Sequence, residues 1–434
     1  MKRLFEDTLM KWKNNGMKKP LMVIGARQTG KTYTIEKFIS ENFEEHLSFN
    51  IEKEERIRDI FEKSIDAEVI IKELELYIGK NIDLDKTVIF FDEIQESERL
   101  ITSLKYFCES KLPFKIICAG SLLGVKLKRL KSSFPVGKVT IEYMYPLNFE
   151  EFLLATGKEM LRDKIKECYK TMTPLPDFAH EDALKLYRLY LCVGGMPEAV
   201  DNFVNNGLDI FKFDFKILSN IRESYVADMK KYVDNKSESV KIEKVYYSIP
   251  EQLAKENKNF QYSILEKNAR GRKYRNPIEW LMASKLVLIA NNVKRVEIPL
   301  KVFADENSFK LYLSDVGLLL NLSEIKYNEV LMDEDFIFKG VITENYVAQE
   351  LIRQFPSLYY WTSDRDAEVD FLIHTNDGTI PIEVKSGINN KSKSLNVYIE
   401  YNKPKYAIRL STRNFGFENN IKSIPLYATF CIKD

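Results

Sequence analysis

Residues 25–32 read Gly25-Ala26-Arg27-Gln28-Thr29-Gly30-Lys31-Thr32, and this stretch decides the fold of the first part of the chain. It fits the pattern G-x-x-x-x-G-K-[ST], which forms a phosphate-binding loop when a strand precedes it and a helix follows. The apolar run at 21–24 predicts the strand, and residues 33–39 predict the helix. The two glycines let the backbone curl so that several N–H groups point at one anion. The stretch therefore predicts a site for a nucleoside triphosphate.

The last two residues of the loop predict the cofactors, ATP and Mg²⁺. Lys31 is expected to reach the β- and γ-phosphates, and the Thr32 hydroxyl is expected to bind the metal ion. The helix that begins near Lys31 adds the positive end of its dipole. The loop residues from Gly25 to Thr32 are together the predicted nucleotide-binding set.

A second block, Thr87-Val88-Ile89-Phe90-Phe91-Asp92-Glu93, predicts hydrolysis as well as binding. Its apolar run is typical of a strand buried on both faces, as in a parallel sheet. The two carboxylates follow at the carboxyl end of that strand, where open α/β sheets place their sites. Asp92 suits the Mg²⁺ shell, and Glu93 suits the base that orients the attacking water.

A third strand, Phe114 to Ala119, leads into Gly120-Ser121. A polar side chain at this point can sense the γ-phosphate or position the water, and Ser121 is the candidate; the alternative is a serine that only begins a turn. Further strands are expected at 46–50 and 138–141. Because strands and helices alternate, the sequence predicts a doubly wound α/β layer.

Composition limits the other partners. The chain has 434 residues, 45% of them hydrophobic and 30% charged, with a formal net charge of +1. Its length predicts two to four domains, and its charge gives no general attraction to nucleic acid or membranes. The five cysteines are scattered, and no apolar run approaches the ~18 residues of a membrane span. These features predict a reduced, cytoplasmic protein that has no membrane partner.

Four segments together resemble the AAA-type ATPases of bacteria and archaea that carry a C-terminal domain of unknown function. They are GARQTGKT (25–32), VIFFDEIQ (88–95), AGSLLG (119–124) and the region 134–152. The resemblance implies an AAA+-like core and, if subunits form rings, an arginine finger supplied in trans. Arg129 is the nearest candidate for that finger, with a solvated basic helix face as the alternative. Arg27 matches the family pattern, and its partner is either the nucleotide or a neighbouring subunit.

The middle of the chain predicts two further domains. Residues 149–232 have helical spacing, interrupted by Gly194-Gly195-Met196-Pro197, which the resemblance places in a helical lid over the nucleotide. Residues 233–328 read as short helices followed by an apolar strand, an order that suggests a winged helix. The segment 267–275 carries five basic residues that could lie against DNA phosphates or form a solvated or protein-binding face.

The last part of the chain, residues 329–434, carries acidic residues at a suggestive spacing. Glu344 lies on an expected helix, Asp370 on an expected strand, and Glu383 and Lys385 share one face of the next strand. Asp370 and Glu383 could hold Mg²⁺, and Lys385 could activate water. The arrangement resembles the PD-(D/E)xK, restriction-endonuclease-like fold, and Gly340-x-x-x-Glu344 is similar to its helix acid in Holliday-junction-resolvase-type members. Glu350 is the alternative helix acid.

The sequence thus predicts an α/β chain with an AAA+-like P-loop NTPase core at 1–148 and a nuclease-like domain at 329–434, joined by the lid and the winged-helix-like part. The leading hypothesis is an ATPase whose cycle controls a DNA-interacting, nuclease-like module. The alternative is an ATP-dependent signalling or assembly switch whose nuclease-like domain is catalytically silent and binds protein, nucleic acid or a second copy of the chain.

Overall fold

The computed structural model describes residues 1–17, 19–125, 135–231, 233, 236–256, 258–332, 338–364, 367–387 and 393–433. Arg129, the candidate arginine finger, lies outside these residues. The chain divides into two compact units. The P-loop unit comprises Lys2–Tyr145 and Ala283–Lys285, and the C-terminal unit comprises Met1, Pro146–Met282 and Leu286–Asp434.

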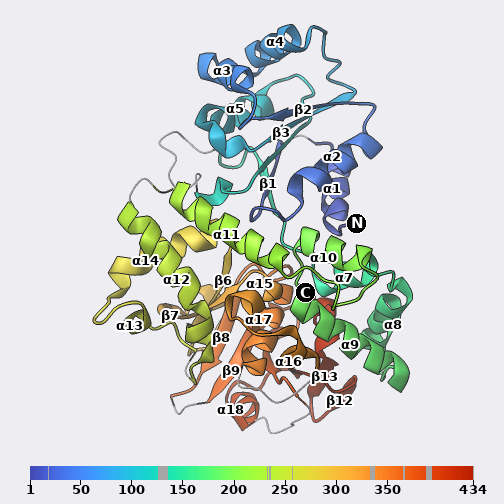
Figure 1. Ribbon diagram of the computed structural model, residues 1–434, viewed down its shortest axis with the longest axis vertical. Helices are drawn as coiled ribbons and strands as arrows, with labels where there is room; N and C mark the ends of the chain where they lie inside the picture. The colour runs from blue at the N-terminus through green and yellow to red at the C-terminus, as the bar shows by residue number, and fades with distance from the viewer. Residues whose placement is uncertain are drawn as a thin grey trace. The chain divides into compact units, whose positions relative to one another are not determined.

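The P-loop unit is built on a five-stranded sheet with the order β2-β3-β4-β1-β5 (Figure 1). All of its strand pairs are parallel, as predicted. The strands are β1 (Leu21–Ile24), β2 (Glu45–Asn50), β3 (Thr87–Asp92), β4 (Ile116–Gly120) and β5 (Thr140–Tyr143). The helices are α1 (Phe5–Asn14), α2 (Lys31–Asn42), α3 (Glu55–Lys63), α4 (Ala67–Ile78), the 3-10 turn η1 (Ile94–Glu96) and α5 (Glu98–Glu109).

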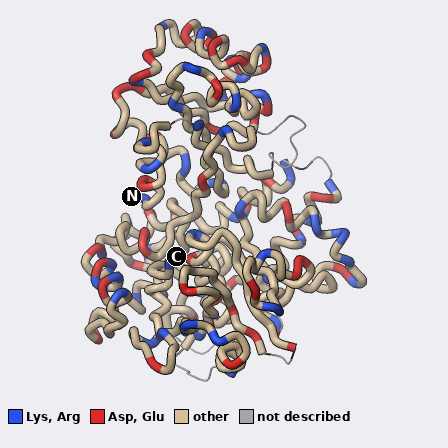
Figure 2. The backbone as a smooth tube through the Cα atoms, turned by 180° about the vertical axis from the view of Figure 1, so that it is seen from behind, with Lys and Arg blue, Asp and Glu red and all other residues tan. Residues whose placement is uncertain are grey.

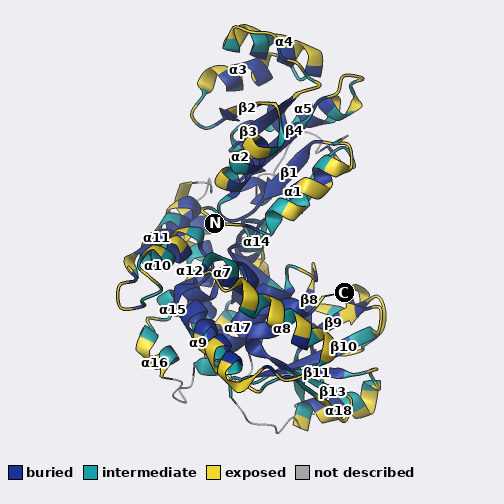
Figure 3. Cartoon of the chain, turned by 90° about the vertical axis from the view of Figure 1, so that its right-hand side faces the viewer, coloured by how far each residue is buried: buried dark blue, intermediate teal, exposed yellow. Residues whose placement is uncertain are grey.

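The inner strands β1, β3 and β4 are buried on both faces, which explains their continuous apolar runs. Along β3, Ile89 and Phe91 pack into one core cluster, while Val88 and Phe90 pack into another on the opposite face. Successive side chains of a strand point to opposite faces, so two covered faces require apolar residues at every position. Figure 3 shows β1 and β3 as buried and the flanking helices with exposed outer surfaces.

The C-terminal unit contains an eight-stranded mixed sheet with the order β12-β13-β11-β10-β9-β8-β6-β7. Its strands are β6 (Val287–Val293), β7 (Ala304–Leu313), β8 (Leu358–Thr362), β9 (Glu368–Thr375), β10 (Gly378–Val384), β11 (Ala407–Ser411), β12 (Gly416–Glu418) and β13 (Ile421–Pro425). Its helices before β6 are α7 (Phe149–Ala155), α8 (Glu159–Thr171), α9 (Asp177–Val193), α10 (Pro197–Asn205), α11 (Lys216–Lys231), α12 (Lys236–Ala254), α13 (Tyr262–Leu265) and α14 (Gly271–Ala283). Those after β6 are η2 (Leu300–Val302), α15 (Val316–Leu322), α16 (Tyr327–Leu331), α17 (Lys339–Leu351), α18 (Lys393–Asn402) and η3 (Leu426–Cys431).

The middle strands of the chain belong to the same sheet as the C-terminal strands. β6 runs parallel to β8, with Ala290 opposite Leu358, and β7 pairs with β6. The predicted boundary between residues 328 and 329 therefore falls between strands of one sheet in one compact unit, and the winged-helix-like character of residues 233–328 stays a prediction. The periodicity of a strand reports which face is buried but not which distant strand is its partner.

The turn at Gly194-Gly195 is held by contacts inside the C-terminal unit. Asp315, which caps α15, accepts a hydrogen bond from the Gly195 N–H at 2.6 Å. A Cβ atom on Gly195 would lie 1.9 Å from the carbonyl oxygen of Leu147, so only glycine fits there. The two glycines therefore serve close packing, and their place in a lid over the nucleotide stays a prediction.

Charge is spread over both units rather than collected on one. Lys and Arg alternate with Asp and Glu along the tube in Figure 2. In the basic segment 267–275, Lys273 pairs with Glu266, and Arg275 pairs with Glu279 at 3.1 Å. Two of its basic side chains are thus engaged within the unit. Within the described part of the chain, no helix combines the length and apolar character that crossing a membrane requires.

Candidate functional site

The phosphate-binding loop lies between β1 and α2, and its two glycines are required by backbone conformation at Gly30 and by a close contact at Gly25. Gly30 has a φ of 84°, in the left-handed region that favours glycine. A Cβ atom on Gly25 would lie 2.2 Å from the carbonyl oxygen of Met144, which follows β5. Arg3 fixes the loop from outside, donating to the carbonyl oxygens of Thr29 at 2.8 Å and Tyr145 at 2.7 Å. No sequence motif pointed to Arg3.

Lys31 is buried at the base of the loop. Its ammonium donates to the carbonyl oxygens of Gly25 at 3.0 Å and Ala26 at 2.7 Å. Burial lowers the pKa of Lys31 to about 8, although the nearby carboxylates Glu93 and Asp92 act in the opposite direction. A buried ammonium held only by neutral carbonyls favours an anionic partner, and phosphate oxygens supply one.

A hydrogen bond joins the phosphate-binding loop to the carboxyl end of β3. The Thr32 hydroxyl donates to Asp92 Oδ2 at 2.7 Å, and the two residues are 60 positions apart in the chain. Desolvation raises the pKa of Asp92, while its hydrogen bond from Thr32 opposes that effect. A hydroxyl and a carboxylate side by side are hard oxygen donors of the kind that Mg²⁺ prefers, so these residues fit the ion.

Glu93 is held by two polar side chains. Gln95 Nε2 donates to Glu93 Oε2 at 2.5 Å, and the Ser121 hydroxyl donates to the same oxygen at 3.4 Å. Gln95 itself is buried against Gly120, where an added Cβ would lie 2.5 Å from Gln95 Oε1. Sequence reasoning placed Glu93 and Ser121 at this site but missed Gln95, although it ends the segment VIFFDEIQ.

The charge of Arg27 also acts at this site, because it is close enough to lower the pKa of Lys31. Among the other loop residues, Gln28 has a positive φ of 62°. Thr29 donates from its hydroxyl to the Ala26 carbonyl oxygen at 3.0 Å. The loop is thus closed by its own hydrogen bonds, with its polar groups already in position.

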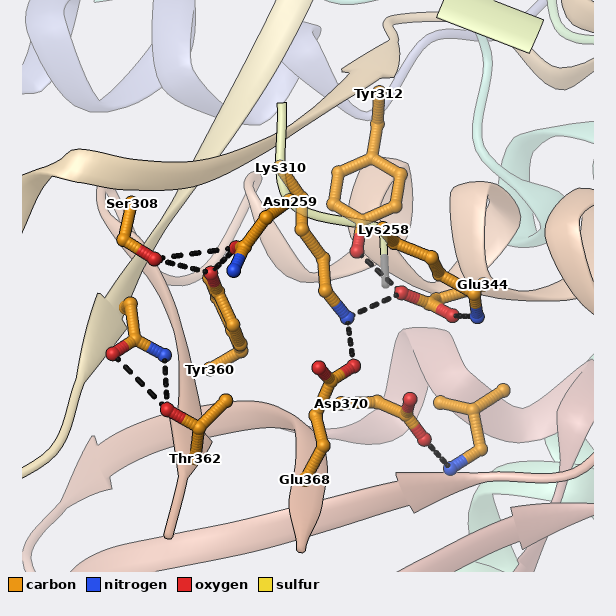
Figure 4. A network of polar contacts seen from close by, with 12 residues as sticks. Lys258, Asn259, Ser308, Lys310, Tyr312, Glu344, Tyr360, Thr362, Glu368 and Asp370 are labelled. Carbon is orange, nitrogen blue, oxygen red and sulfur yellow. Dashed lines mark hydrogen bonds and ion pairs between the residues drawn. The ribbon is translucent and has the colours of Figure 1, made fainter. Parts of the chain in front are cut away.

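A second polar centre lies in the C-terminal unit, around Glu344 of α17 (Figure 4). Lys310 donates to Glu344 Oε1 at 3.1 Å and the Tyr312 hydroxyl donates to the same oxygen at 2.5 Å. Lys258 forms a short ion pair with Glu344 Oε2. Both carboxylate oxygens of the predicted helix acid are therefore engaged by cationic or hydroxyl donors of this chain.

The charged groups of this centre strongly shift one another's pKa values. Burial alone would raise the pKa of Glu344, but Lys258 and Lys310 lower it to about 2. Burial would lower the pKa of Lys310, yet Glu344 and Glu368 raise it above its ordinary value. Lys310 and Glu344 are therefore a charged pair, stabilised by each other inside the unit.

Asp370, Glu383 and Lys385 lie beside this pair. The β9–β10 register places Phe371 opposite Ile382, so Asp370 and Glu383 come next in line across the two strands. Asp370 Oδ2 accepts the Val384 N–H at 2.7 Å, and Lys385 pairs with Glu383 Oε1 at 2.6 Å. Desolvation, with the charges of Glu344 and Glu383, raises the pKa of Asp370 to about 8.

These residues do not fit the Mg²⁺ ion that a nuclease-like fold implies. Glu344 is saturated by donors, and one oxygen of Glu383 is bound by Lys385. The other oxygen of Glu383, Oε2, is buried and has no hydrogen-bond partner among the described residues. Over the same residues, no group of three or more His, Cys, Asp or Glu side chains is arranged to hold a metal ion.

Glu350, the alternative helix acid, has a different role. It accepts the Phe149 N–H at 2.9 Å and so holds the beginning of α7. Burial raises the pKa of Glu350 to about 7, and Arg353 only partly opposes this. Its contacts are with α7 and not with the lysines around Glu344.

Sequence reasoning missed Lys258, Lys310, Tyr312 and Glu368. Lys258, Lys310 and Tyr312 come from segments outside the acidic pattern, whereas Glu368 lies on β9 two positions before Asp370. One signal was present, because Lys310 is a lone charge in the run Phe309-Lys310-Leu311-Tyr312-Leu313. A lysine inside a buried strand needs a charged partner nearby.

Three family matches cover most of the chain. Residues 17–153 match a family described as an AAA domain. Residues 184–329 and 339–429 match two families described as domains of unknown function, DUF8612 and DUF4143. Together with the parallel sheet and the loop geometry, the first match identifies the P-loop unit as an AAA-type P-loop ATPase domain.

Solved structures show distant likeness over larger parts of the chain. The Walker-type ATPase PABY2304 of Pyrococcus abyssi is 15% identical, with 73% of this chain and 94% of that chain covered and a TM-score of 0.43. The ORC2 protein of Aeropyrum pernix is 11% identical, with 78% and 92% covered and a TM-score of 0.36. PCH-2 of C. elegans is 13% identical, with 45% and 60% covered and a TM-score of 0.27. The comparison with curated proteins found no match.

Proposed function

We propose that this protein is a Mg²⁺-dependent ATPase whose nucleotide cycle controls a non-cleaving binding or assembly module in the C-terminal unit. The observation that carries the ATPase is the 2.7 Å hydrogen bond from Thr32 to Asp92. It joins the phosphate-binding loop to the acidic strand end, which is the meeting of parts that phosphoryl transfer requires.

Binding depends on the loop. Lys31 would exchange its carbonyl partners for the β- and γ-phosphate oxygens, which are stronger acceptors because they are charged. Thr32 and Asp92 would hold Mg²⁺, which neutralises charge on the phosphates when bound. The backbone N–H groups of the loop and the beginning of α2 would bind the remaining phosphate charge.

Hydrolysis depends on Glu93. Gln95 and Ser121 both donate to Glu93 Oε2, so Oε1 is the oxygen left to accept a proton from the attacking water. Ser121, at the end of β4, would report the presence of the γ-phosphate to this carboxylate. The mechanism is positioning and charge stabilisation, with Glu93 as the general base.

The ATPase proposal is tested with two variants and a matched control. Lys31→Ala should abolish ATP binding, and Glu93→Gln should keep binding but lower kcat at least ~100-fold, because it removes a general base. Lys37→Ala is the control, since Lys37 lies on the same helix but pairs with Glu6 at 3.0 Å. Normal ATP turnover by Lys31→Ala would refute the proposal.

For the C-terminal unit, the contacts favour the silent module over the nuclease. Glu383, which would bind metal, pairs with Lys385, which would activate water, and the helix acid Glu344 pairs with Lys310. The wild type should therefore leave supercoiled DNA intact in ATP and Mg²⁺. Nicking that disappears in Lys385→Ala would establish the nuclease instead.

The switch itself predicts nucleotide-dependent association. Light scattering or analytical ultracentrifugation with ATP, ADP and no nucleotide should show an assembly state or partner affinity that changes with ATP. Lys31→Ala should lose that change. An identical state in all three conditions, with and without DNA, would argue against a switch even if ATP hydrolysis is confirmed.

A further inference from the structure

We propose that the ammonium group of Lys310 is a resident cation that takes the place of a divalent metal ion in the acidic centre of the C-terminal unit. We further infer that removing this charge turns the centre into a divalent-metal site. The inference rests on the proposed absence of DNA cleavage and gives it a structural cause.

The surroundings of Lys310 are those of a bound cation. The side chain is fully buried, and its ammonium lies 3.1 Å from Glu344 Oε1 and 2.5 Å from Glu368 Oε1. It also lies over the ring of Tyr360, 4.7 Å from the ring centre. Figure 4 shows the ammonium between the two carboxylates. Oxygen donors on two sides and an aromatic face on another are a complete setting for a single positive charge.

Lys310 lies on an edge strand of the eight-stranded sheet. Lys310 lies on β7, and its partner on β6 is Ala290. Residues directly opposite in a sheet share a face, and the small, fully buried Ala290 leaves room above it. The lysine side chain can therefore extend over β6 and the Tyr360 ring of β8 toward Glu368 on β9.

The charge balance of the centre disfavours a further metal ion. Its four carboxyl groups belong to Glu344, Glu368, Asp370 and Glu383, and its three ammonium groups to Lys258, Lys310 and Lys385. The Arg409 guanidinium also acts on Glu383, so the formal charge is zero when all groups are ionised. Without Lys310 it becomes minus one, which favours a cation, and the freed oxygens of Glu344 and Glu368 lie near Asp370.

The test measures Mn²⁺ binding by the full chain without nucleotide. Calorimetry and the EPR signal of free Mn²⁺ are the two readouts. Lys310→Met keeps an unbranched side chain, one heavy atom shorter, and removes the charge. It should bind one more Mn²⁺ per chain than the wild type, with an affinity at least ~10-fold above any wild-type binding at this centre. Adding Asp370→Asn should abolish the extra site. Lys405→Met is the control, because it removes a lysine paired with Asp377 at 2.6 Å in the same unit.

Two results would overturn the inference. One is a wild-type Mn²⁺ site that Asp370→Asn removes, since the centre would then bind metal with Lys310 in place. The other is a folded Lys310→Met that gains no Mn²⁺. Circular dichroism establishes folding, and if Lys310→Met is unfolded, Lys310→Gln supplies the same test, because it also removes the charge between Glu344 and Glu368. DNA nicking is measured separately, so failure of the proposed function and failure of the metal inference are distinguishable.

Discussion

At the residue scale, two buried lysines show how the groups around an ammonium decide whether its pKa falls or rises. Lys31 is held by neutral carbonyl oxygens, and burial lowers its pKa to about 8. Lys310 is held by carboxylates, which raise its pKa despite complete burial. The first ammonium gains by exchanging its partners for phosphate, whereas the second already has its counter-charges. Ligand binding is therefore expected at Lys31 and structural pairing at Lys310.

Glu350 predicts a pH dependence of stability. Its pKa is raised to about 7 in the folded protein from an ordinary value of 4.5. The folded state therefore favours the proton, and this contribution is complete below about pH 4.5 and is lost as pH rises through 7. Glu350→Gln stays neutral, so relative to wild type it should be more stable at pH 8 than at pH 5, by up to ~3 kcal/mol. Urea unfolding at both pH values measures this, with the exposed Glu418→Gln as the control; equal differences at the two pH values would contradict it.

Gly195 predicts a steric effect. Alanine there would place Cβ 1.9 Å from the Leu147 carbonyl oxygen, and the backbone would have to move. Gly195→Ala should lower the free energy of unfolding by at least ~1 kcal/mol. Gly340→Ala, in α17 with no atom within 4 Å of the new Cβ, should be neutral or stabilising by up to ~1 kcal/mol. Similar effects of the two changes on urea unfolding would refute the packing role of the turn.

At the element scale, β6 and β7 form a platform for Lys310, and Ala290 is the position that keeps it open. Ala290→Leu should displace the lysine from Glu368 and cost about 1–3 kcal/mol of unfolding free energy. In the background of Lys310→Met the same change should cost less, because the displaced charge is absent. A double-mutant cycle measures this coupling, and strictly additive effects would show that Ala290 does not act through Lys310.

The same elements show what could be predicted from sequence. The loop at 25–32 and the pair Asp92-Glu93 were predictable because strand, turn and helix signals adjoin them. The β-strands that carry Asp370 and Glu383 were predictable from alternation. The pairing of β6 with β8 and the reach of Lys258 and Lys310 to Glu344 were not, because such contacts join residues far apart in the chain.

At the scale of the whole molecule, the two units have separate sheets and cores. Thermal unfolding should therefore show two transitions, and ATP with Mg²⁺ should raise the one that belongs to the P-loop unit. At a ligand concentration of ~100 times Kd the gain is about 2.7 kcal/mol. Lys31→Ala should remove the shift. Differential scanning calorimetry with and without nucleotide measures it, and a single transition that ignores ATP would contradict the division.

The parallel pairing of β6 with β8 also bears on inheritance. The two families of unknown function that match residues 184–329 and 339–429 contribute neighbouring strands to one sheet. A gene that acquired the second segment alone would encode a protein with the edge of β8 uncovered, and bare strand edges promote aggregation. The two segments are therefore expected to be transmitted as a pair in evolution.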